Sequence, residues 1–295
     1  MSATFQNVQK VIKMKYLGYF NGKYDELDNL QIPRLDRVCF FGDGIYDATY
    51  CRNYVIHDLK QHVDRFYRSA DLLEMEVPMC KKELSALLCD LVKKVDSHEQ
   101  FVYFQLTRGT GIRNHIYPDK EKVKGNLWVV LTPKKIVDTY KKVKLITRED
   151  TRFLHCNAKT VNLIPACMGA NAAELQGADE CVFHRGDEVT ECAHSNVHII
   201  KDGRFITHPA DEKILNGISR LNLLRKCGEL GIPIEERVFT VDELLDADEI
   251  IISSCGSFCL QASHIDGKPV GGRAGEILKA LQDGLVKEFD EECGV

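Results

Sequence analysis

The sequence predicts a mixed α/β protein built from two domains. The chain has 295 residues, of which 44% are hydrophobic and 28% charged, a balance typical of globular proteins whose length favours about two domains. Amphipathic helical patterns alternate with short strand-like runs in both halves. A polar, lysine-rich stretch at residues 134–142 lacks both patterns. We therefore expect a first domain at residues 1–133, a linker at 134–142 and a second domain at 143–295.

The first half predicts a hairpin, two helices and two strands. Asn21-Gly22 lies between aromatic and aliphatic residues, which is the strongest short hairpin signal. Apolar residues at helical spacing predict helices over Asp58–Met75, with Asp58 as a candidate N-cap, and over Lys81–Val95. Strands are expected at Phe101–Thr107 and Leu127–Thr132, separated by a polar segment that contains glycines.

The second half begins with a strand at Val143–Thr147, followed by a helix over about Asn162–Gly177, whose glycine supplies a C-terminal stop. Two hairpins are expected around Arg185-Gly186-Asp187 and Asp202-Gly203. The remaining expected elements are a helix from Ser219, a strand at Glu249–Ser253 and a final helix over Glu276–Phe289.

Composition and charge argue against several classes of protein. The formal net charge of −5 gives no electrostatic reason to expect nucleic acid or an anionic membrane as partner. No apolar run approaches the roughly 20 residues of a membrane span, and Met1–Lys15 lacks the apolar core of a secretory signal. The 12 cysteines include no CxxC pair, so we expect no structural disulfides, no metal site and a cytoplasmic location.

Lys159 is a candidate nucleophile within Cys156–Asn162. Few charged residues surround it, and a helix is expected just after it. Desolvation lowers the pKa of a partly buried lysine, and a neutral amine is the form that attacks an aldehyde. Spacing alone leaves open a solvated surface lysine, because lysine is seldom buried.

Two segments could bind an anion. In Gly217-Ile218-Ser219-Arg220 a loop meets an expected helix, so the N–H groups of Ile218 and Ser219 could point at a phosphate. A plain N-cap serine is the alternative. The segment Ser253-Ser254-Cys255-Gly256-Ser257, after an isoleucine-rich strand, offers hydroxyl and N–H groups for the same purpose, or forms a simple polar turn.

Three basic residues, Arg108, Arg113 and His115, lie in a segment with two glycines. A guanidinium there could hold a carboxylate through two parallel hydrogen bonds, although a solvated basic loop has the same composition. Glu191 follows a strand, where its carboxylate could pair with a protonated ring nitrogen or be solvated.

Seven short segments, taken in order, resemble the class IV aminotransferases, which use pyridoxal 5'-phosphate. They are Phe41-Gly42-Asp43-Gly44-Ile45-Tyr46-Asp47, His62-Val63-Asp64-Arg65, Thr107-Arg108-Gly109, Lys159-Thr160-x-Asn162, Thr190-Glu191, Ser195-Asn196 and Leu215-x-Gly217-Ile218-x-Arg220. The resemblance covers about residues 19–267. It implies fold type IV, with a small N-terminal α/β domain and a larger C-terminal pseudo-barrel domain.

The resemblance also implies roles for individual residues. Lys159 is expected to carry the cofactor and to shuttle the substrate proton, with Glu191 as the partner of the pyridine nitrogen. Tyr46 is expected near the lysine, where its hydroxyl would orient cofactor and substrate. The residues expected to bind the cofactor phosphate are Arg65, Ile218, Ser219, Ser254 and Cys255. The family also implies a homodimer in which the neighbouring subunit lends the substrate loop.

Within this family, Arg113-Asn114-His115 resembles the Arg-x-His of the D-amino acid aminotransferases. In those enzymes the pair, with the tyrosine matching Tyr46, traps the α-carboxylate and selects the D enantiomer. The resemblance therefore implies transamination between a D-amino acid similar to D-alanine and a 2-oxo acid such as 2-oxoglutarate.

The chain also departs from the family pattern near the substrate. Cys192-Ala193-His194 stands where D-alanine enzymes have glycine and serines, and Cys255-Gly256 replaces a threonine pair. Ala48 and Tyr50 are expected to line the substrate pocket. These differences leave the preferred amino acid open.

Three alternatives remain open for the function. An L-branched-chain aminotransferase on the same fold is disfavoured by Arg113 and His115. An aminodeoxychorismate lyase would share Lys159, Glu191 and Arg65. A catalytically silent, cofactor-binding homologue is disfavoured because binding alone would not need Lys159 and Glu191 together with a tyrosine at position 46.

Overall fold

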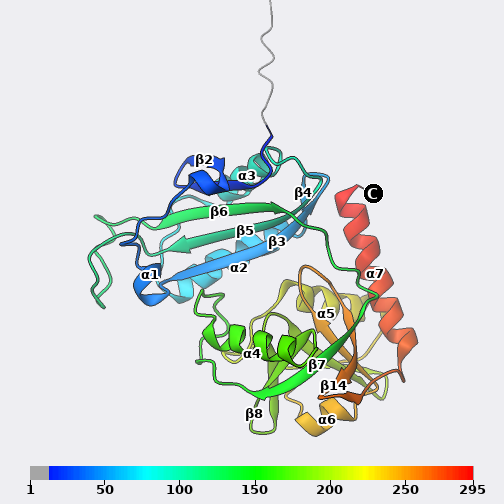
Figure 1. Ribbon diagram of the computed structural model, residues 1–295. Coiled ribbons are helices and arrows are strands. Elements are labelled where there is room, and N and C mark those ends of the chain that lie inside the picture. Colours follow the sequence, from blue (N-terminus) through cyan, green and yellow to red (C-terminus); the bar gives the residue numbers. More distant parts are fainter. Residues whose placement is uncertain (1–12, 295) are drawn as a thin grey trace, which may run out of the picture.

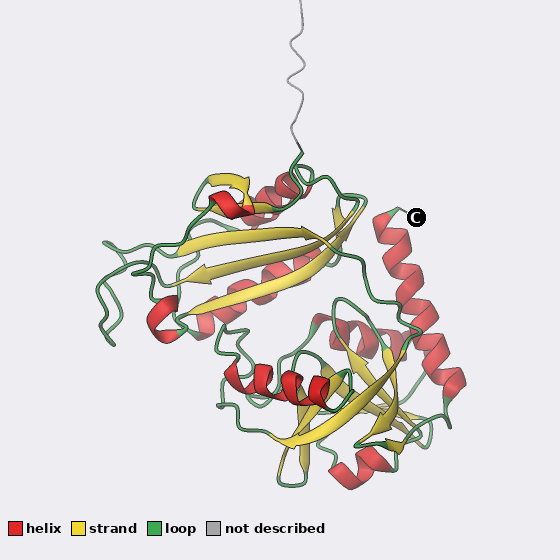
Figure 2. Cartoon of the chain, viewed as in Figure 1, coloured by secondary structure: helices red, strands yellow, loops and turns green. Residues whose placement is uncertain are grey.

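The computed structural model describes residues 13–294, so most of the segment Met1–Lys15, for which the sequence predicts no secretory signal, lies outside the described residues. The chain forms two β-sheets, one above the other in Figure 1, each with its own helices. Figure 2 shows that the upper sheet is a gently twisted layer and that the lower sheet is strongly curled. The mixed α/β class predicted from the sequence is confirmed.

The first sheet has six strands in the order β2-β1-β6-β5-β3-β4. Their bounds are Leu17–Phe20 (β1), Lys23–Glu26 (β2), Gly44–Arg52 (β3), Val55–Ile56 (β4), Glu99–Thr107 (β5) and Asn126–Pro133 (β6). The helices of this half are η1 (Leu27–Asn29), α1 (Val38–Phe41), α2 (Leu59–Leu72) and α3 (Lys81–Val92).

Alternation along the strands gives the first sheet two different faces. Successive strand residues point to opposite sides, and Ile45 on β3 belongs to the buried core that includes Phe66 of α2 and Leu88 of α3. Its neighbour Tyr46 therefore points away from these helices. This second face of the sheet lies toward the curled sheet (Figure 1).

The second sheet has nine strands, eight of them in the order β12-β11-β10-β13-β14-β7-β8-β9, with β15 paired to β14. Their bounds are Lys142–Glu149 (β7), Glu180–Arg185 (β8), Glu188–Cys192 (β9), Asn196–Lys201 (β10), Arg204–Thr207 (β11), Ile234–Glu236 (β12), Glu249–Ser253 (β13), Leu260–Ile265 (β14) and Lys268–Pro269 (β15). The helices of this half are α4 (Ile164–Leu175), α5 (Ile218–Leu230), α6 (Val241–Leu245) and α7 (Gly275–Cys293).

Helix α7 runs along one side of the molecule and reaches the first sheet near β4 (Figure 1). Its last turns bind that half of the chain through an ion pair and a polar contact, since Arg52 contacts Asp290 at 3.1 Å and His57 contacts Glu292 at 2.5 Å. The last helix thus ties the two halves together. Within the described residues, no helix is both long and apolar enough to span a bilayer.

The strand and helix predictions are confirmed for the longer elements. The first sheet ends at Pro133 and the second begins at Lys142, and these separate sheets support the two-domain division, which we retain as a proposal. Asp58 is the N-cap residue of α2, as predicted, but its side chain does not cap the helix. Its φ of 50° is left-handed and its side chain makes no cap hydrogen bond, because the carboxylate accepts instead from Asn222 Nδ2 at 2.6 Å.

Candidate active site

The start of β3 pairs with the loop that carries Lys159. Tyr46 N–H donates to Lys159 O at 2.9 Å, and Val161 N–H donates to Gly44 O at 3.1 Å. These bonds form an antiparallel bridge between two segments that are distant in the sequence. The ammonium of Lys159 consequently lies 4.4 Å from the centre of the Tyr46 ring.

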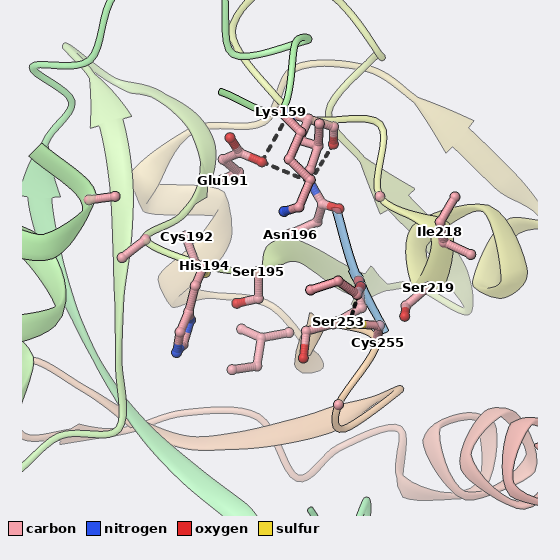
Figure 3. Close-up of a pocket in the computed structure, with 18 of the residues that line it drawn as sticks. Lys159, Glu191, Cys192, His194, Ser195, Asn196, Ile218, Ser219, Ser253 and Cys255 are labelled. Carbon is pink, nitrogen blue, oxygen red and sulfur yellow. Dashed lines mark hydrogen bonds between the residues drawn. The ribbon is translucent and has the colours of Figure 1, made fainter. Parts of the chain in front are cut away.

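A cavity of about 500 Å³ opens around Lys159, lined by residues of both sheets. Its volume lies within the roughly 300–1,000 Å³ of small-molecule and cofactor sites. In Figure 3, Lys159 projects into the cavity between Glu191 on one side and Ser219, Ser253 and Cys255 on the other. The cavity therefore has an acidic end and an end rich in hydrogen-bond donors.

Glu191 is held at the acidic end by three donors. Its carboxylate pairs with Arg152 and accepts hydrogen bonds from Asn196 Nδ2 and Leu215 N–H, both at 3.0 Å. Burial raises the pKa of Glu191, while Arg152 and the Leu215 N–H stabilise its ionised form. The side chain is thus fixed in place and able to accept a hydrogen bond from a cationic ring.

Gly217 is required by this arrangement. A Cβ at this position would lie 2.2 Å from Asn196 Oδ1, so any side chain there would displace the amide that holds Glu191. The segments Ser195-Asn196 and Leu215-x-Gly217, which stand apart in the sequence, therefore meet in one structural unit.

The donor-rich end is formed by a group that we call the anion cradle, namely Arg65, Ile218, Ser219, Ser254 and Cys255. Helix α5 begins there after Gly217, and no side chain caps it. The first N–H groups of a helix have no intrahelical partner and attract anions. The anion cradle suits a phosphate group in both charge and hydrogen-bond donors.

Arg65 is held in the anion cradle by a fully buried carboxylate. Asp47 accepts from Arg65 Nε at 2.8 Å and pairs with His62 Nδ1 at 2.8 Å. Burial alone would raise the pKa of Asp47, but Arg65 and His62 hold that pKa well below its usual value. His62 Nε2 has no hydrogen-bond partner among residues 13–294, although the side chain lines the cavity.

Tyr50 explains one departure from the family pattern. Its ring is buried in the cavity wall, and a Cβ at Gly256 would lie only 2.7 Å from a ring carbon. Gly256 thus makes room for the large Tyr50 side chain. The neighbouring Cys255 is fixed by a hydrogen bond from its thiol to Ala48 O at 3.2 Å.

Most residues predicted for the site line the cavity, and these are Tyr46, Arg65, Lys159, Glu191, Ile218, Ser219, Ser254 and Cys255. In the part of the chain that the structure describes, the lining includes neither Arg113 nor His115. Both lie on the exposed loop between β5 and β6, where they contact the Phe41 ring at 5.1 and 5.2 Å. A single chain therefore does not bring the predicted carboxylate trap to its own cavity.

Arg108, the third basic residue singled out in the sequence, has a structural contact. Arg108 binds Asp43 at 3.0 Å and donates to Leu73 O at 2.7 Å. Its guanidinium is thus committed to the protein itself, which leaves Arg113 as the candidate arginine for a ligand.

Sequence reasoning missed two residues that hold the site together. Arg152 pairs with Glu191 from 39 positions away, and Asp47 pairs with Arg65 from 18 positions away. No local spacing connects either pair. The one available signal was that Asp47 stands within the segment that resembles the family and alternates with Tyr46 along the chain.

The fold and the site together define a class of enzyme. A lysine in a cavity between two sheets, a buried carboxylate at one end and an anion cradle at the other match the demands of a phosphorylated, ring-containing aldehyde cofactor. The family model described as amino-transferase class IV matches residues 44–265. The chain therefore belongs to the class IV aminotransferase family.

The comparisons with individual proteins agree on this family. The chain is 38% identical over 278 residues to a D-alanine aminotransferase of Listeria monocytogenes, covering 93% of this chain and 96% of the relative. It is 34% identical over 274 residues to that of Staphylococcus aureus, covering 92% and 97%.

Solved structures show the same fold. The Escherichia coli branched-chain amino acid aminotransferase has a TM-score of 0.84 at 19% identity, covering 94% of this chain and 95% of that chain. A branched-chain enzyme from T.th., solved with pyridoxamine 5'-phosphate, has a TM-score of 0.83 at 22% identity, covering 94% of both chains. The predicted fold type is thereby confirmed.

The buried ion pair beneath the anion cradle gives a stability prediction. Asp47→Asn should destabilise the protein by about 3–5 kcal/mol, the range for removing one partner of a buried ion pair. The pKa of Asp47 lies below the usual value of about 4. Its stabilising effect is therefore complete above that pH and is lost as the pH falls toward the lowered pKa of the folded state. The free energies of unfolding of wild type and variant, measured in urea without cofactor, should therefore differ less in acid than at neutral pH.

Asp64→Asn is the matched control for this measurement. Asp64 contacts Lys60 and Lys81, each at 2.7 Å, at the surface of α2 and α3. Such exposed pairs contribute about 0–1 kcal/mol. Equal unfolding midpoints for the two variants would show that Asp47 has no special role in stability.

The contact between Tyr50 and Gly256 gives a second prediction. Gly256→Ala should lower the free energy of unfolding by about 1–3 kcal/mol, as overpacking of a core does. It should also lower the melting temperature. In a Tyr50→Val background the same change should lower the free energy of unfolding much less, because the ring that the added methyl group would contact is absent.

Gly228→Ala controls for the loss of a glycine, since nothing lies within 4 Å of a Cβ at Gly228 in α5. This change should be neutral or stabilising in a helix. If Gly256→Ala destabilised the protein equally with and without the Tyr50 ring, the proposed packing of Gly256 against Tyr50 would be ruled out.

Proposed function

We propose that the protein is a pyridoxal-phosphate-dependent aminotransferase that moves amino groups between D-amino acids and 2-oxo acids. The observation that carries this proposal is the placement of Lys159 between the Glu191 carboxylate and the anion cradle (Figure 3). The names of the Listeria monocytogenes and Staphylococcus aureus relatives support D-alanine or a similar small donor. We propose 2-oxoglutarate as an acceptor.

The residues of the cavity fit the cofactor. The anion cradle offers the guanidinium of Arg65 and the uncapped start of α5 to a phosphate. His62 Nε2, which has no partner among residues 13–294, lies in the same lining and can meet a further polar group. At the other end, Glu191 supplies the anionic partner that a pyridine nitrogen needs in order to stay protonated.

The chain's own side chains divide the catalytic work. Pyridoxal phosphate, when bound, supplies an aldehyde for amines and a ring that takes up electrons from the substrate α-carbon. Lys159 Nζ then serves as the base that removes the α-proton and returns it during transfer. Tyr46, whose ring lies against this ammonium, limits its movement. Because donor and acceptor use the same groups in turn, ping-pong kinetics are expected.

Stereochemistry is assigned to the α-carboxylate trap. We propose that Arg113 and His115 hold the carboxylate together with Tyr46, which fixes the face on which the α-proton points at Lys159. The branched-chain alternative is supported only by the fold of solved structures that are 19% and 22% identical to this chain. The lyase alternative shares the cofactor residues and differs in the products that it would release.

We further propose a homodimer in which each subunit's loop between β5 and β6 reaches the partner's cavity. Arg113 and His115 lie off the cavity of their own chain, yet the loop exposes Ile112 and Ile116 at 88% and 76%. Helix α4 is also rich in exposed apolar side chains, namely Ile164, Met168 and Leu175. Large apolar side chains that are this exposed are candidates for a protein interface.

We propose a cytoplasmic location for the enzyme. Its cysteines, all of which lie within the described residues, are free thiols. Disulfides are rare in reducing compartments, so this state agrees with the location expected from the sequence.

An amino-donor panel tests the proposed reaction. With 2-oxoglutarate present, D-alanine should be turned over faster than L-leucine, and aminodeoxychorismate should not be cleaved. Lys159→Ala should abolish transfer, because the base at the α-carbon is missing. Borohydride reduction of the wild type, followed by mass spectrometry, should place the cofactor on the peptide that contains Lys159.

Two outcomes would contradict the proposal. Preference for L-leucine over every D-amino acid would remove D specificity, and an adduct on a different lysine would remove the site assignment. Lys159→Ala should keep its melting temperature close to that of the wild type, which separates loss of chemistry from loss of fold.

Mixed dimers test the shared site. Arg113→Ala should lower kcat/KM about 10- to 150-fold, as expected for losing a hydrogen bond to a charged group. Refolding Lys159→Ala chains together with Arg113→Ala chains should restore activity, since one of the two sites in a mixed dimer would receive both intact residues. Each parent refolded alone is the control. An active monomer in light scattering, or no gain on mixing, would reject the shared site.

A further inference from the structure

We propose that Lys134 forms a second anion subsite in the same cavity, which binds the ω-carboxylate of a dicarboxylic substrate. The ligands would be 2-oxo diacids such as 2-oxoglutarate and acidic D-amino acids. This inference rests on the proposed aminotransferase function and specifies its substrate class. It assigns a role to a residue directly after β6 that the cofactor chemistry does not use.

The first argument is a comparison of the lysines and arginines in the cavity lining. Three of them are paired with carboxylates, namely Arg65 with Asp47 at 2.7 Å, Lys141 with Asp179 at 2.8 Å and Arg152 with Asp150 at 2.9 Å. Over residues 13–294, no carboxylate lies within ion-pair distance of Lys134 or Lys159. Since Lys159 is assigned to the cofactor, Lys134 is the remaining uncompensated positive charge in this lining.

The second argument is the position of the Lys134 ammonium. It lies 5.2 Å from the centre of the Phe101 ring and 6.0 Å from that of Tyr50, on aromatic residues that face each other across β3 and β5. The backbone of Lys134 is fixed by a hydrogen bond from its N–H to Glu99 O at 3.1 Å. The aromatic rings attract the ammonium without neutralising its charge, because they carry no net negative charge.

The third argument is the length of substrate that the site can hold. Tyr46 lies beside Lys159, and Tyr50 lies beside Lys134, four strand positions further along β3. Four positions correspond to about 13 Å. The α-carbon and the ω-carboxylate of a five-carbon diacid are roughly 5 Å apart, because three C–C bonds of about 1.5 Å separate them. A contact between the α-carbon and Lys159, a hydrogen bond of about 3 Å from Lys134 to the carboxylate and the reach of a flexible lysine span the rest. A three-carbon acid such as pyruvate would not reach Lys134.

Other charged groups of the cavity do not compete for this carboxylate. His194, which differs from the family pattern, contacts Glu180, and Glu180 also accepts from Ser195 Oγ at 2.9 Å. Asp179 is neutralised by Lys141. These acidic residues of the lining thus have partners within the protein, and Lys134 keeps a positive charge that no carboxylate of residues 13–294 neutralises.

Matched acceptors test the subsite. With D-alanine as donor, Lys134→Gln should lower kcat/KM for 2-oxoglutarate about 5- to 50-fold, between the values for exposed ion pairs and for hydrogen bonds to charged groups. The change for 2-oxopentanoate, which has the same chain length without the ω-carboxylate, should stay below about twofold, because its apolar end makes no ion pair. Lys134→Arg should retain most of the activity with 2-oxoglutarate.

Lys135→Gln is the matched control, since the neighbouring Lys135 is exposed and absent from the lining formed by the described residues. It should leave both acceptors unchanged. Glutarate binding to the cofactor-loaded protein, measured by calorimetry, gives a readout without turnover and should weaken in Lys134→Gln. An equal loss for both acceptors, or none for 2-oxoglutarate and glutarate, would overturn the subsite. Failure of the wild type to transaminate would instead reject the proposed function, and glutarate binding would still decide the subsite.

Discussion

The site depends on the short antiparallel bridge between the start of β3 and the Lys159 loop. Backbone hydrogen bonds at Gly44 and Tyr46 fix the loop against the first sheet, although the loop leads into α4 of the second half. Because strand residues alternate between faces, the same strand places Tyr46 in the cavity and Asp47 in the interior, where it holds Arg65. Strand β3 thus fixes Lys159 and supports the anion cradle, so the backbone of a single strand positions both.

Charge compensation is the second constraint on the cavity. Burying an unpaired ion costs several kcal/mol, so buried charges persist when they are paired. Arg65 and Arg152 both meet buried carboxylates, which allows them to stay ionised whether or not a ligand is present. Among the described residues, Lys134 and Lys159 have no such partner. Lys134 is exposed and Lys159 is half-buried, so both can exchange water for a substrate or cofactor at lower cost. Cations that are paired with carboxylates thus support the structure of the site, whereas the unpaired cations are the ones proposed to bind ligands.

Sequence patterns predicted elements whose signals are local. Asn21-Gly22 marked the first hairpin, and β13 was predicted with its observed bounds from an isoleucine-rich run. Two-residue strands such as β4 carry no periodicity and were missed. Asp58 was correctly placed at the N-cap of α2, but the contact of its carboxylate with Asn222, which is distant in the sequence, could not be predicted. The proposed cofactor residues followed from family resemblance, whereas Arg152, the partner of Glu191, depends on a tertiary contact that no spacing predicts.

The fold leaves substrate choice to a few side chains. Solved branched-chain enzymes share this fold at TM-scores of 0.84 and 0.83, while the curated relatives cited above are D-alanine enzymes, so the architecture accommodates both reactions. The groups proposed to hold the cofactor come from the bridge, α2, β9, the start of α5 and the turn after β13. The residues proposed to select the substrate lie elsewhere, on the loop between β5 and β6 and on the wall around Tyr50. Since the two proposed sets share no residue apart from Tyr46, substitutions on the wall can change the preferred substrate side chain while the charges proposed to hold the cofactor stay in place.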